Sequence, residues 1–242
     1  MGRCNLAVDL NLVLLTVELI LLIPTLALLI LGRRETRGRQ TLLRQMATTA
    51  MAVSRQEYFN SVQFGMQSAV KSIKGAITGS IPHTPEQKDQ VEGILEQIRH
   101  AKRRNISVQY LLPKTQDRIG LASKYKDAGA DLKFHAGLTV IDIRYMIVDG
   151  KYLVLGLPSA AGENEPTREG YVIPSEGLAQ ILLEKFENLW SQAVTYDDYL
   201  RDVLQETRSY NPNISNKLLS MKLDVSESDV KRILSAVPPL TQ

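Results

Sequence analysis

The fold is decided by the stretch DIRYMIVDGKYLVLG, residues 142–156. Two runs of apolar, strand-forming residues lie on either side of positions 149–151. Asp-Gly between two such runs is a strong short-range signal of a β-hairpin. We therefore expect one buried strand before the turn and a second strand over residues 152–155.

The composition is that of one domain of ordinary size with an appendage. Of the 242 residues, 44% are hydrophobic, which excludes large-scale disorder. The single cysteine, Cys4, excludes an internal disulfide and a cysteine-based zinc cluster. Removing the five arginines and three acidic residues of positions 1–39 from the totals of 29 and 26 leaves 24 basic and 23 acidic residues. This nearly neutral body argues against a broad nucleic-acid surface.

Residues 10–31 form an apolar run that is long enough to cross a bilayer. Its 22 residues span roughly 33 Å as a helix, against a hydrocarbon core of about 30 Å. A signal peptide is disfavoured because Arg3 alone charges the region before the run and no small-residue cleavage site follows. A buried core helix fits poorly with the arginine-rich flank. We expect a retained transmembrane helix.

The arginines around this run predict its orientation. One arginine precedes the run, whereas five follow it, at positions 33, 34, 37, 39 and 44. The positive-inside bias therefore places the short N-terminus outside and the remaining chain in the cytoplasm, as a single-pass protein.

Two residues inside the run indicate contact with another membrane helix. Glu18 would place a carboxylate at membrane depth, which is costly unless the group is protonated or partnered. Pro24 would kink the helix near its middle. The alternative is a simple anchor that tolerates Glu18 near the interface.

Helical and strand patterns alternate after the run. Residues 41–74 carry an apolar stripe typical of a helix, either the first helix of a domain or a coiled-coil seam between protomers. Residues 84–87 predict a capped helix start, and Gly129 a helix end. The basic cluster 102–104 is either a solvated helix end or a phosphate site. We expect a layered α/β domain over residues 41–195, between an N-terminal anchor at 1–40 and a helical tail at 196–242.

The order of these elements resembles that of the phospholipase D-like domain. The resemblance covers roughly residues 45–194. It rests on a Gly-broken strand, a helix with a basic end before residues 106–111, a turn at 128–131, the hairpin, and a closing helix with Phe186 and Trp190. It implies a layered α/β/α fold. A related arrangement occurs in the non-catalytic sensor domains of some archaeal sugar-responsive transcription regulators.

The hairpin carries the family's motif in degenerate form. In the superfamily a His, a Lys two residues on and an Asp five residues later precede such a turn, and a Gly follows. This sequence has Asp142 in place of the His and Arg144 in place of the Lys, whereas Asp149 and Gly156 fit.

The substitutions argue against the family's reaction. The resemblance implies that a His attacks phosphorus and a Lys stabilises the oxyanion. Asp142 would be repelled by an anionic phosphodiester, so we expect no catalytic residue. Arg144 either binds an anion such as phosphate or pairs internally with Asp142 or Asp149. We expect no cofactor, and no metal, because no two of the histidines lie at metal-ligand spacing.

The tail predicts two short helices, over residues 214–223 and 226–236. Their connection at 224–230 resembles the turn of a helix-turn-helix, although the pair lacks a third helix. Docking to a protein partner or to the chain's own body is the interpretation we favour over DNA binding.

Three functions remain open from the sequence. The first is a non-catalytic, membrane-anchored accessory or scaffolding subunit, with the bilayer and other membrane-complex subunits as partners and homo-oligomerisation as an option. The second is a divergent phosphodiesterase or lipid hydrolase that works as a dimer. The third is a membrane-tethered ligand sensor or transcription regulator.

Overall fold

The computed structural model describes residues 51–78, 84–139, 143–158 and 167–236. The chain divides into two units, Met1–Thr48 and Thr49–Gln242, and the described residues all belong to the second. The predicted membrane run at 10–31, with Glu18 and Pro24, lies outside them. Among the described residues, no helix combines the length and hydrophobicity needed to cross a membrane.

The predicted hairpin is confirmed. Strand β5 (Arg144–Val148) pairs antiparallel with β6 (Tyr152–Pro158), and a turn at Asp149 and Gly150 joins them. Both turn residues have positive φ, 52° at Asp149 and 70° at Gly150. Residues 149–151 connect the paired Val148 and Tyr152, and the N–H of Lys151 donates to the carbonyl oxygen of Val148 to close a β-turn. Positive φ at both central positions favours Asp-Gly there.

The hairpin belongs to a larger sheet. The other strands are β1 (Met51–Ser54), β2 (Ser72–Ala76), β3 (Ser107–Pro113), β4 (Asp131–His135), β7 (Thr167–Ile173) and β8 (Val194–Thr195). Within the described residues, these eight strands form one mixed sheet in the order β1-β7-β6-β5-β2-β3-β4-β8. Strands β2, β3 and β4 are parallel, and the other neighbours are antiparallel.

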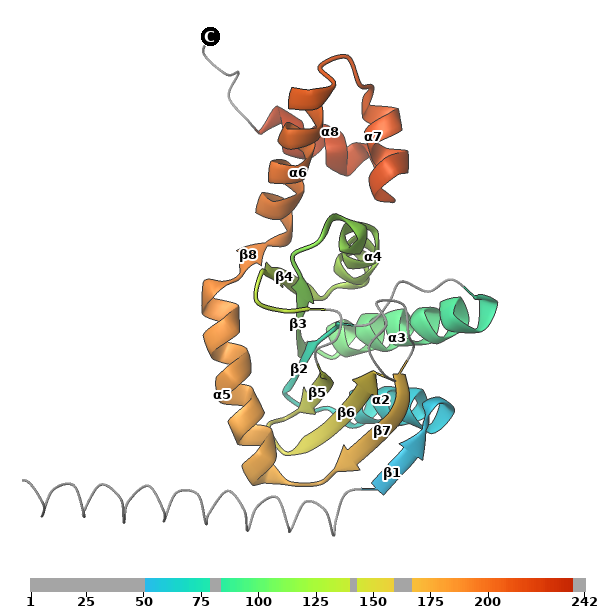
Figure 1. Ribbon diagram of the computed structural model, residues 1–242. Helices are drawn as coiled ribbons and strands as arrows, with labels where there is room; N and C mark the ends of the chain where they lie inside the picture. Colours follow the sequence, from blue (N-terminus) through green and yellow to red (C-terminus); the bar gives the residue numbers. More distant parts are fainter. Residues whose placement is uncertain (1–50, 79–83, 140–142, 159–166, 237–242) are drawn as a thin grey trace, which may run out of the picture. The chain divides into compact units, whose positions relative to one another are not determined.

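Helices cover both faces of the sheet. They are α2 (Arg55–Ser68), α3 (Pro85–Arg103), α4 (Ile119–Ala128), α5 (Glu176–Gln192), α6 (Tyr196–Tyr210), α7 (Asn216–Leu223) and α8 (Glu227–Ser235), with a short 3-10 helix η1 (Gln116–Arg118). Figure 1 shows α2, α3 and α4 on one side of the sheet and α5 on the other. This mixed, layered α/β arrangement agrees with the expected fold class.

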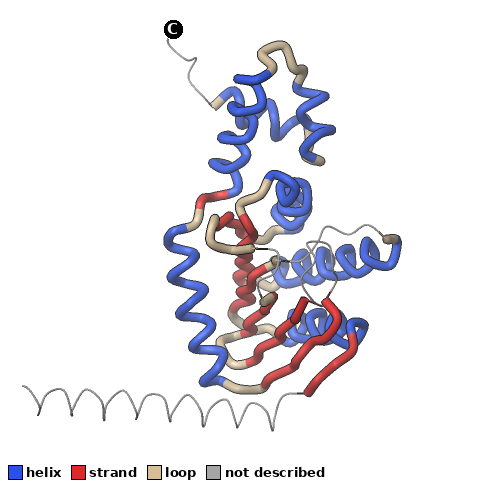
Figure 2. Tube along the Cα trace, viewed as in Figure 1, coloured by secondary structure: helices blue, strands red, loops and turns tan. Residues whose placement is uncertain are grey.

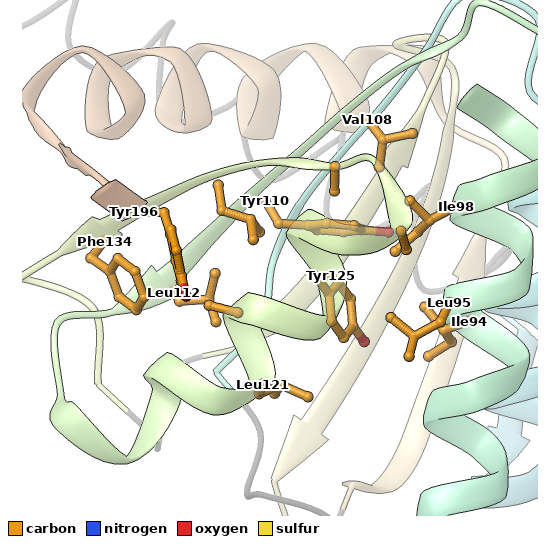
Figure 3. Close-up of a cluster of buried hydrophobic side chains, with 14 of the residues drawn as sticks. Ile94, Leu95, Ile98, Val108, Tyr110, Leu112, Leu121, Tyr125, Phe134 and Tyr196 are labelled. Carbon is orange, nitrogen blue, oxygen red and sulfur yellow. The ribbon is translucent and has the colours of Figure 1, made fainter. Parts of the chain in front are cut away.

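Side-chain alternation along the strands separates the two layers. In β2, Ile73 belongs to the core on the side of α2 and α3, whereas Lys74 contacts Glu187 and the ring of Phe186 in α5. Figure 3 shows how Tyr110 and Leu112 of β3 and Tyr125 of α4 meet within the core.

Helix boundaries follow the signals in the sequence. Thr84 accepts a hydrogen bond from the backbone N–H of Gln87, and the Gln87 side chain accepts one from the N–H of Thr84, which completes a capping box at the start of α3. Gly129 ends α4 with a φ of 108°. Both predictions are confirmed.

The prediction of one helix over residues 41–74 is confirmed only for Arg55–Ser68 (α2) and is wrong at both ends of the described part of that range. Residues 51–54 are strand β1, which pairs with β7, and α2 ends at Ser68. The next strand, β2, starts at Ser72, inside the range predicted to be helical. The partner strand β7 lies more than a hundred residues away, and this non-local pairing overrides the local pattern.

The tail contains a third helix, which corrects the expectation of an isolated pair. Residues 196–210 do not continue α5, because the short strand β8 breaks the chain; α6 then packs with α8, which packs with α7 (Figure 2). Leu200 and Leu204 of α6 and Val230 of α8 join the same core as the sheet. The described residues after 195 therefore share one core with the α/β layers.

Candidate functional site

Asp149 closes a loop at one end of the hairpin. Its carboxylate accepts hydrogen bonds from the backbone N–H groups of Val70, Lys71 and Ser72, at 2.9, 2.7 and 2.9 Å. Burial alone would raise the pKa of this carboxyl group, but the three donors together outweigh it and lower the pKa below its usual value. Asp149 therefore joins the hairpin turn to the α2–β2 connection.

Arg144 occupies the other end of the same strand. It is the first residue of β5 and pairs in register with Gly156 of β6. Only 9% of the residue is exposed. Burying a guanidinium costs free energy, so a buried arginine marks a candidate functional position.

A cavity of about 120 Å³ lies beside Arg144. Helices α2, α3 and α4 and strands β2, β3 and β5 all contribute to its wall. The described lining residues are Tyr58, Phe59, Val62, Ala76, Ile77, Val91, Ile94, Tyr110, Leu121, Tyr125, Arg144, Tyr145 and Met146. The cavity is thus aromatic and aliphatic, with a charged group at its wall.

The tyrosines of this cavity are held neutral at physiological pH. Burial raises the pKa of Tyr58 to about 12, although the charge of Arg144 opposes the shift. Burial also raises the pKa of Tyr125 and of Tyr110, and the Tyr110 hydroxyl lies 3.9 Å from the Met66 sulfur. These hydroxyl groups are weak dipoles in the wall rather than acids or bases.

The structure thus separates the motif positions rather than gathering them. Arg144 and Asp149 are five residues apart along an extended strand, about 17 Å at roughly 3.3 Å per residue. Their internal ion pair, one alternative from the sequence, is incompatible with this spacing and with the Asp149 hydrogen bonds. Asp142 lies outside the described residues.

The described histidines do not complete a catalytic pair with Arg144. His135 ends β4, three strands from β5 in the sheet, which is about 14 Å. Its Nδ1 accepts a hydrogen bond from the N–H of Gly137 at 3.0 Å. His100 is followed by Lys102 at the family's His-x-Lys spacing, but both residues lie on helix α3, where positions two apart do not face each other.

Metal ligands are not gathered anywhere in the described part of the chain, where no three His, Cys, Asp or Glu side chains come together. The basic cluster 102–104 also has partners: Arg103 binds Glu96, and Arg104 donates to the carbonyl oxygens of Met66 and Gln67. Arg104 thus connects the end of α3 to the end of α2.

The helix-turn-helix interpretation finds little chemical support in α6–α8. Residues 196–236 carry six basic and seven acidic side chains. Arg232, a candidate phosphate contact, binds Asp197 and Asp229 within the unit. The α7–α8 turn packs on α4 instead, where Lys124 binds Asp224 at 2.8 Å.

Solved structures similar to this chain include a phospholipase D family member. This protein, Nuc from Salmonella typhimurium, is 17% identical over 61% of this chain and 97% of its own, with a TM-score of 0.47. NucT from Helicobacter pylori is 20% identical over 60% and 98% of the two chains, with a TM-score of 0.46. TrmBL2, an archaeal chromatin protein, is 19% identical over 67% and 63%, with a TM-score of 0.44. No protein-family model matches the sequence, and no match was found among curated proteins.

Proposed function

We propose that the chain is a non-catalytic, membrane-anchored phospholipase D-like protein that serves as an accessory or scaffolding subunit of a membrane complex, with its α/β body in the cytoplasm. The observation that carries the non-catalytic part is the environment of Arg144. This residue stands where the family has a lysine, yet it lies beside an apolar cavity, away from both described histidines.

The chemistry of the motif supports the same proposal. In the family's reaction an uncharged histidine attacks the phosphorus, and cations surround the developing charge. Asp142 would add a negative charge at the position of the nucleophile. Asp149 is engaged by three backbone donors and is not a general acid, because its pKa is lowered.

The membrane role rests on the sequence of residues 10–31. Glu18 and Pro24 within an apolar run favour a helix that packs against partner helices, since a lone carboxylate facing lipid is unfavourable. The nearly neutral body gives little reason to expect a nucleic-acid partner. The partners are therefore the lipid bilayer and other membrane subunits, including further copies of this chain.

The test is the size of the complex after mild detergent extraction from its native membrane. We expect the full chain to migrate with additional subunits, identified by mass spectrometry. Glu18→Leu should release it as a smaller species, whereas Asn11→Leu, a matched change in the same run, should not. A monomer in the unmodified membrane would contradict the proposal, as would a complex that Glu18→Leu leaves intact.

A further inference from the structure

Positively charged side chains gather at the end of the sheet where the hairpin turns. Strands β2 and β3 begin at this end, because β2 is antiparallel to β5 and parallel to β3. Lys71 precedes β2, Lys151 follows the turn, and α3 ends at Arg103 just before β3. Lys102 and Arg104 flank Arg103, and all five side chains are exposed. We call Lys71, Lys102, Arg103, Arg104 and Lys151 the basic edge.

Hydrogen bonds join the segments of the basic edge into one surface. The carboxylate of Asp149 accepts from the backbone N–H groups of Val70 and Lys71, which ties the hairpin turn to the α2–β2 connection. The N–H of Ser107, at the start of β3, donates to the carbonyl oxygen of Lys71 at 3.2 Å. Arg104 donates to two carbonyl oxygens in the last turn of α2. The cations are therefore held on a continuous surface rather than on separate loops.

Positive charge exceeds negative charge on this surface. The acidic side chains that the described contacts place at the basic edge are Asp149 and Glu96, and both are engaged. Asp149 accepts the backbone N–H groups, and Glu96 binds Arg103 at 2.9 Å and Arg99 at 3.1 Å. The excess attracts an anionic surface over about one Debye length, roughly 8 Å at physiological ionic strength.

Val70 adds an apolar tip to the basic edge. Its side chain is 75% exposed, next to Lys71, while its backbone N–H is fixed by Asp149. An aliphatic side chain of this kind can enter the boundary between headgroups and acyl chains, while neighbouring lysines stay among the headgroups. Stacking on nucleic-acid bases uses aromatic rings or guanidinium planes instead. The combination favours a lipid surface over a nucleic acid.

The polypeptide enters the body at the same end of the sheet. Met51, the first residue of β1, pairs with Val172 of β7, which pairs with Val154 of β6. Strand β7 is antiparallel to both neighbours, so β1 and β6 run in the same direction, away from the hairpin turn. The arginine-rich stretch 33–44, which follows the predicted membrane run, thus leads into a strand that begins at the end of the sheet with the basic edge.

We infer that the basic edge, with Val70 at its tip, is a membrane-binding surface that takes an anionic lipid bilayer. The inference rests on the proposed membrane attachment. It adds the face that the body turns toward the lipid and a preference for acidic phospholipids. Each lysine or arginine near an anionic surface strengthens such contact by about fivefold, so the few cations of the basic edge suffice for a reversible contact.

An environment-sensitive fluorescent label at position 70 tests the inference in the full chain. It is attached to Val70→Cys in a Cys4→Ser background, because Cys4 is the single cysteine. The protein is placed in phosphatidylcholine vesicles with or without phosphatidylserine. We expect a blue shift of the emission only with phosphatidylserine, reversed by high salt. The control label at Tyr210→Cys, a residue 84% exposed at the end of α6, should not shift. Equal emission from position 70 in both kinds of vesicle would overturn the inference.

Retention of the chain in neutral vesicles after alkaline carbonate extraction is measured separately. It reports on the proposed membrane helix, whereas the label at position 70 reports on the basic edge. Loss of the chain from neutral vesicles would therefore contradict the anchor, and an unshifted label on a retained chain would contradict only the present inference.

Two double variants locate the contact. Lys71→Gln with Lys102→Gln should lower the ratio of lipid-bound to free label about tenfold or more. Lys217→Gln with Lys222→Gln removes the same charge from exposed positions of α7 and should leave the ratio unchanged. Thermal unfolding verifies that both variants are folded. Equal ratios in the two variants would overturn the assignment to the basic edge, and so would a label shift caused by duplex DNA but not by phosphatidylserine.

Discussion

Arg144 and Asp149 lie at the two ends of one strand-and-turn segment and have different roles. Asp149 accepts three backbone hydrogen bonds and joins the turn to residues 70–72, whereas Arg144 is buried beside a cavity. In the sequence, the spacing of these two residues suggests a single site. In the structure, Asp149 has a structural role, and only Arg144 occupies a position where chemistry is possible. The hairpin and Asp149 can therefore be retained because the fold needs them, while the chemical role of position 144 changes.

Asp149→Asn should lower the free energy of unfolding by about 1–3 kcal/mol, because charge-assisted hydrogen bonds to backbone donors are lost. Asparagine tolerates the positive φ of this position, so the change isolates the carboxylate. Chemical denaturation measures the effect, with the exposed Asp131→Asn as the control. Equal unfolding free energies for the two variants would contradict the role given to Asp149.

The acid dependence of stability should also report on Asp149. Its pKa is lowered in the folded protein, so its contribution is present above the unfolded pKa and is lost as the pH falls through the folded value. The Asp149→Asn variant should consequently lose less stability than the unmodified chain on acidification below about pH 4. Parallel pH-dependent denaturation curves of the two proteins would be the opposing result.

Two helical glycines should respond in opposite directions to alanine. A Cβ at Gly120 would lie 2.6 Å from the Asp224 Cβ and would push α4 away from the α7–α8 turn. Gly120→Ala should therefore lower the free energy of unfolding by about 1–3 kcal/mol. A Cβ at Gly93 would meet only the flexible amide end of Gln63, so Gly93→Ala should stabilise by up to about 1 kcal/mol. Melting temperatures compare the two variants; destabilisation by Gly93→Ala, or tolerance of Gly120→Ala, would argue against the packing described.

An acid-sensitive link should join the C-terminal helices to α4. Asp197 binds Lys126 at 2.7 Å and both terminal nitrogens of Arg232 at 3.1 Å. The hydrogen bonds from Arg232, then those from Lys126, lower the pKa of Asp197 to about 2, from its usual 3.8.

The contribution of Asp197 is therefore complete above about pH 4 and is lost as the pH falls toward 2. Asp197→Asn should remove it, at a cost of up to about 1 kcal/mol at neutral pH, since a pair this exposed is screened by water. The control is Asp202→Asn, on the exposed side of the same helix. If both variants have the unmodified stability between pH 2 and 7, the link is not formed in solution.

The sequence predicts those parts of the fold that depend on local chemistry. The Asp-Gly turn, the Thr84–Gln87 capping box and the Gly129 helix end each rest on the conformational preference of one or two residues, and all are found. Strand β1 depends instead on pairing with β7, and its four residues, Met-Ala-Val-Ser, do not alternate between apolar and polar. The break at β8, which creates the third tail helix, likewise depends on pairing with β4.

The candidate site is only partly visible in the sequence. Arg144 stands out because it occupies a motif position on a buried strand. The cavity does not, because Tyr58, Ile94 and Tyr125 lie on three different helices and meet only through tertiary packing. Tyrosine at core positions of otherwise aliphatic elements is the one signal that could have indicated it.

Whether the chain hydrolyses phosphodiesters tests the central claim most directly. The purified full chain, its Asp142→Ala variant and its Arg144→Ala variant would be assayed on generic phosphodiester substrates across pH 5–9. We predict that all three show the same background rate, because the nucleophile is absent. Robust turnover by the unmodified chain that Asp142→Ala abolishes would contradict the claim and identify an enzyme.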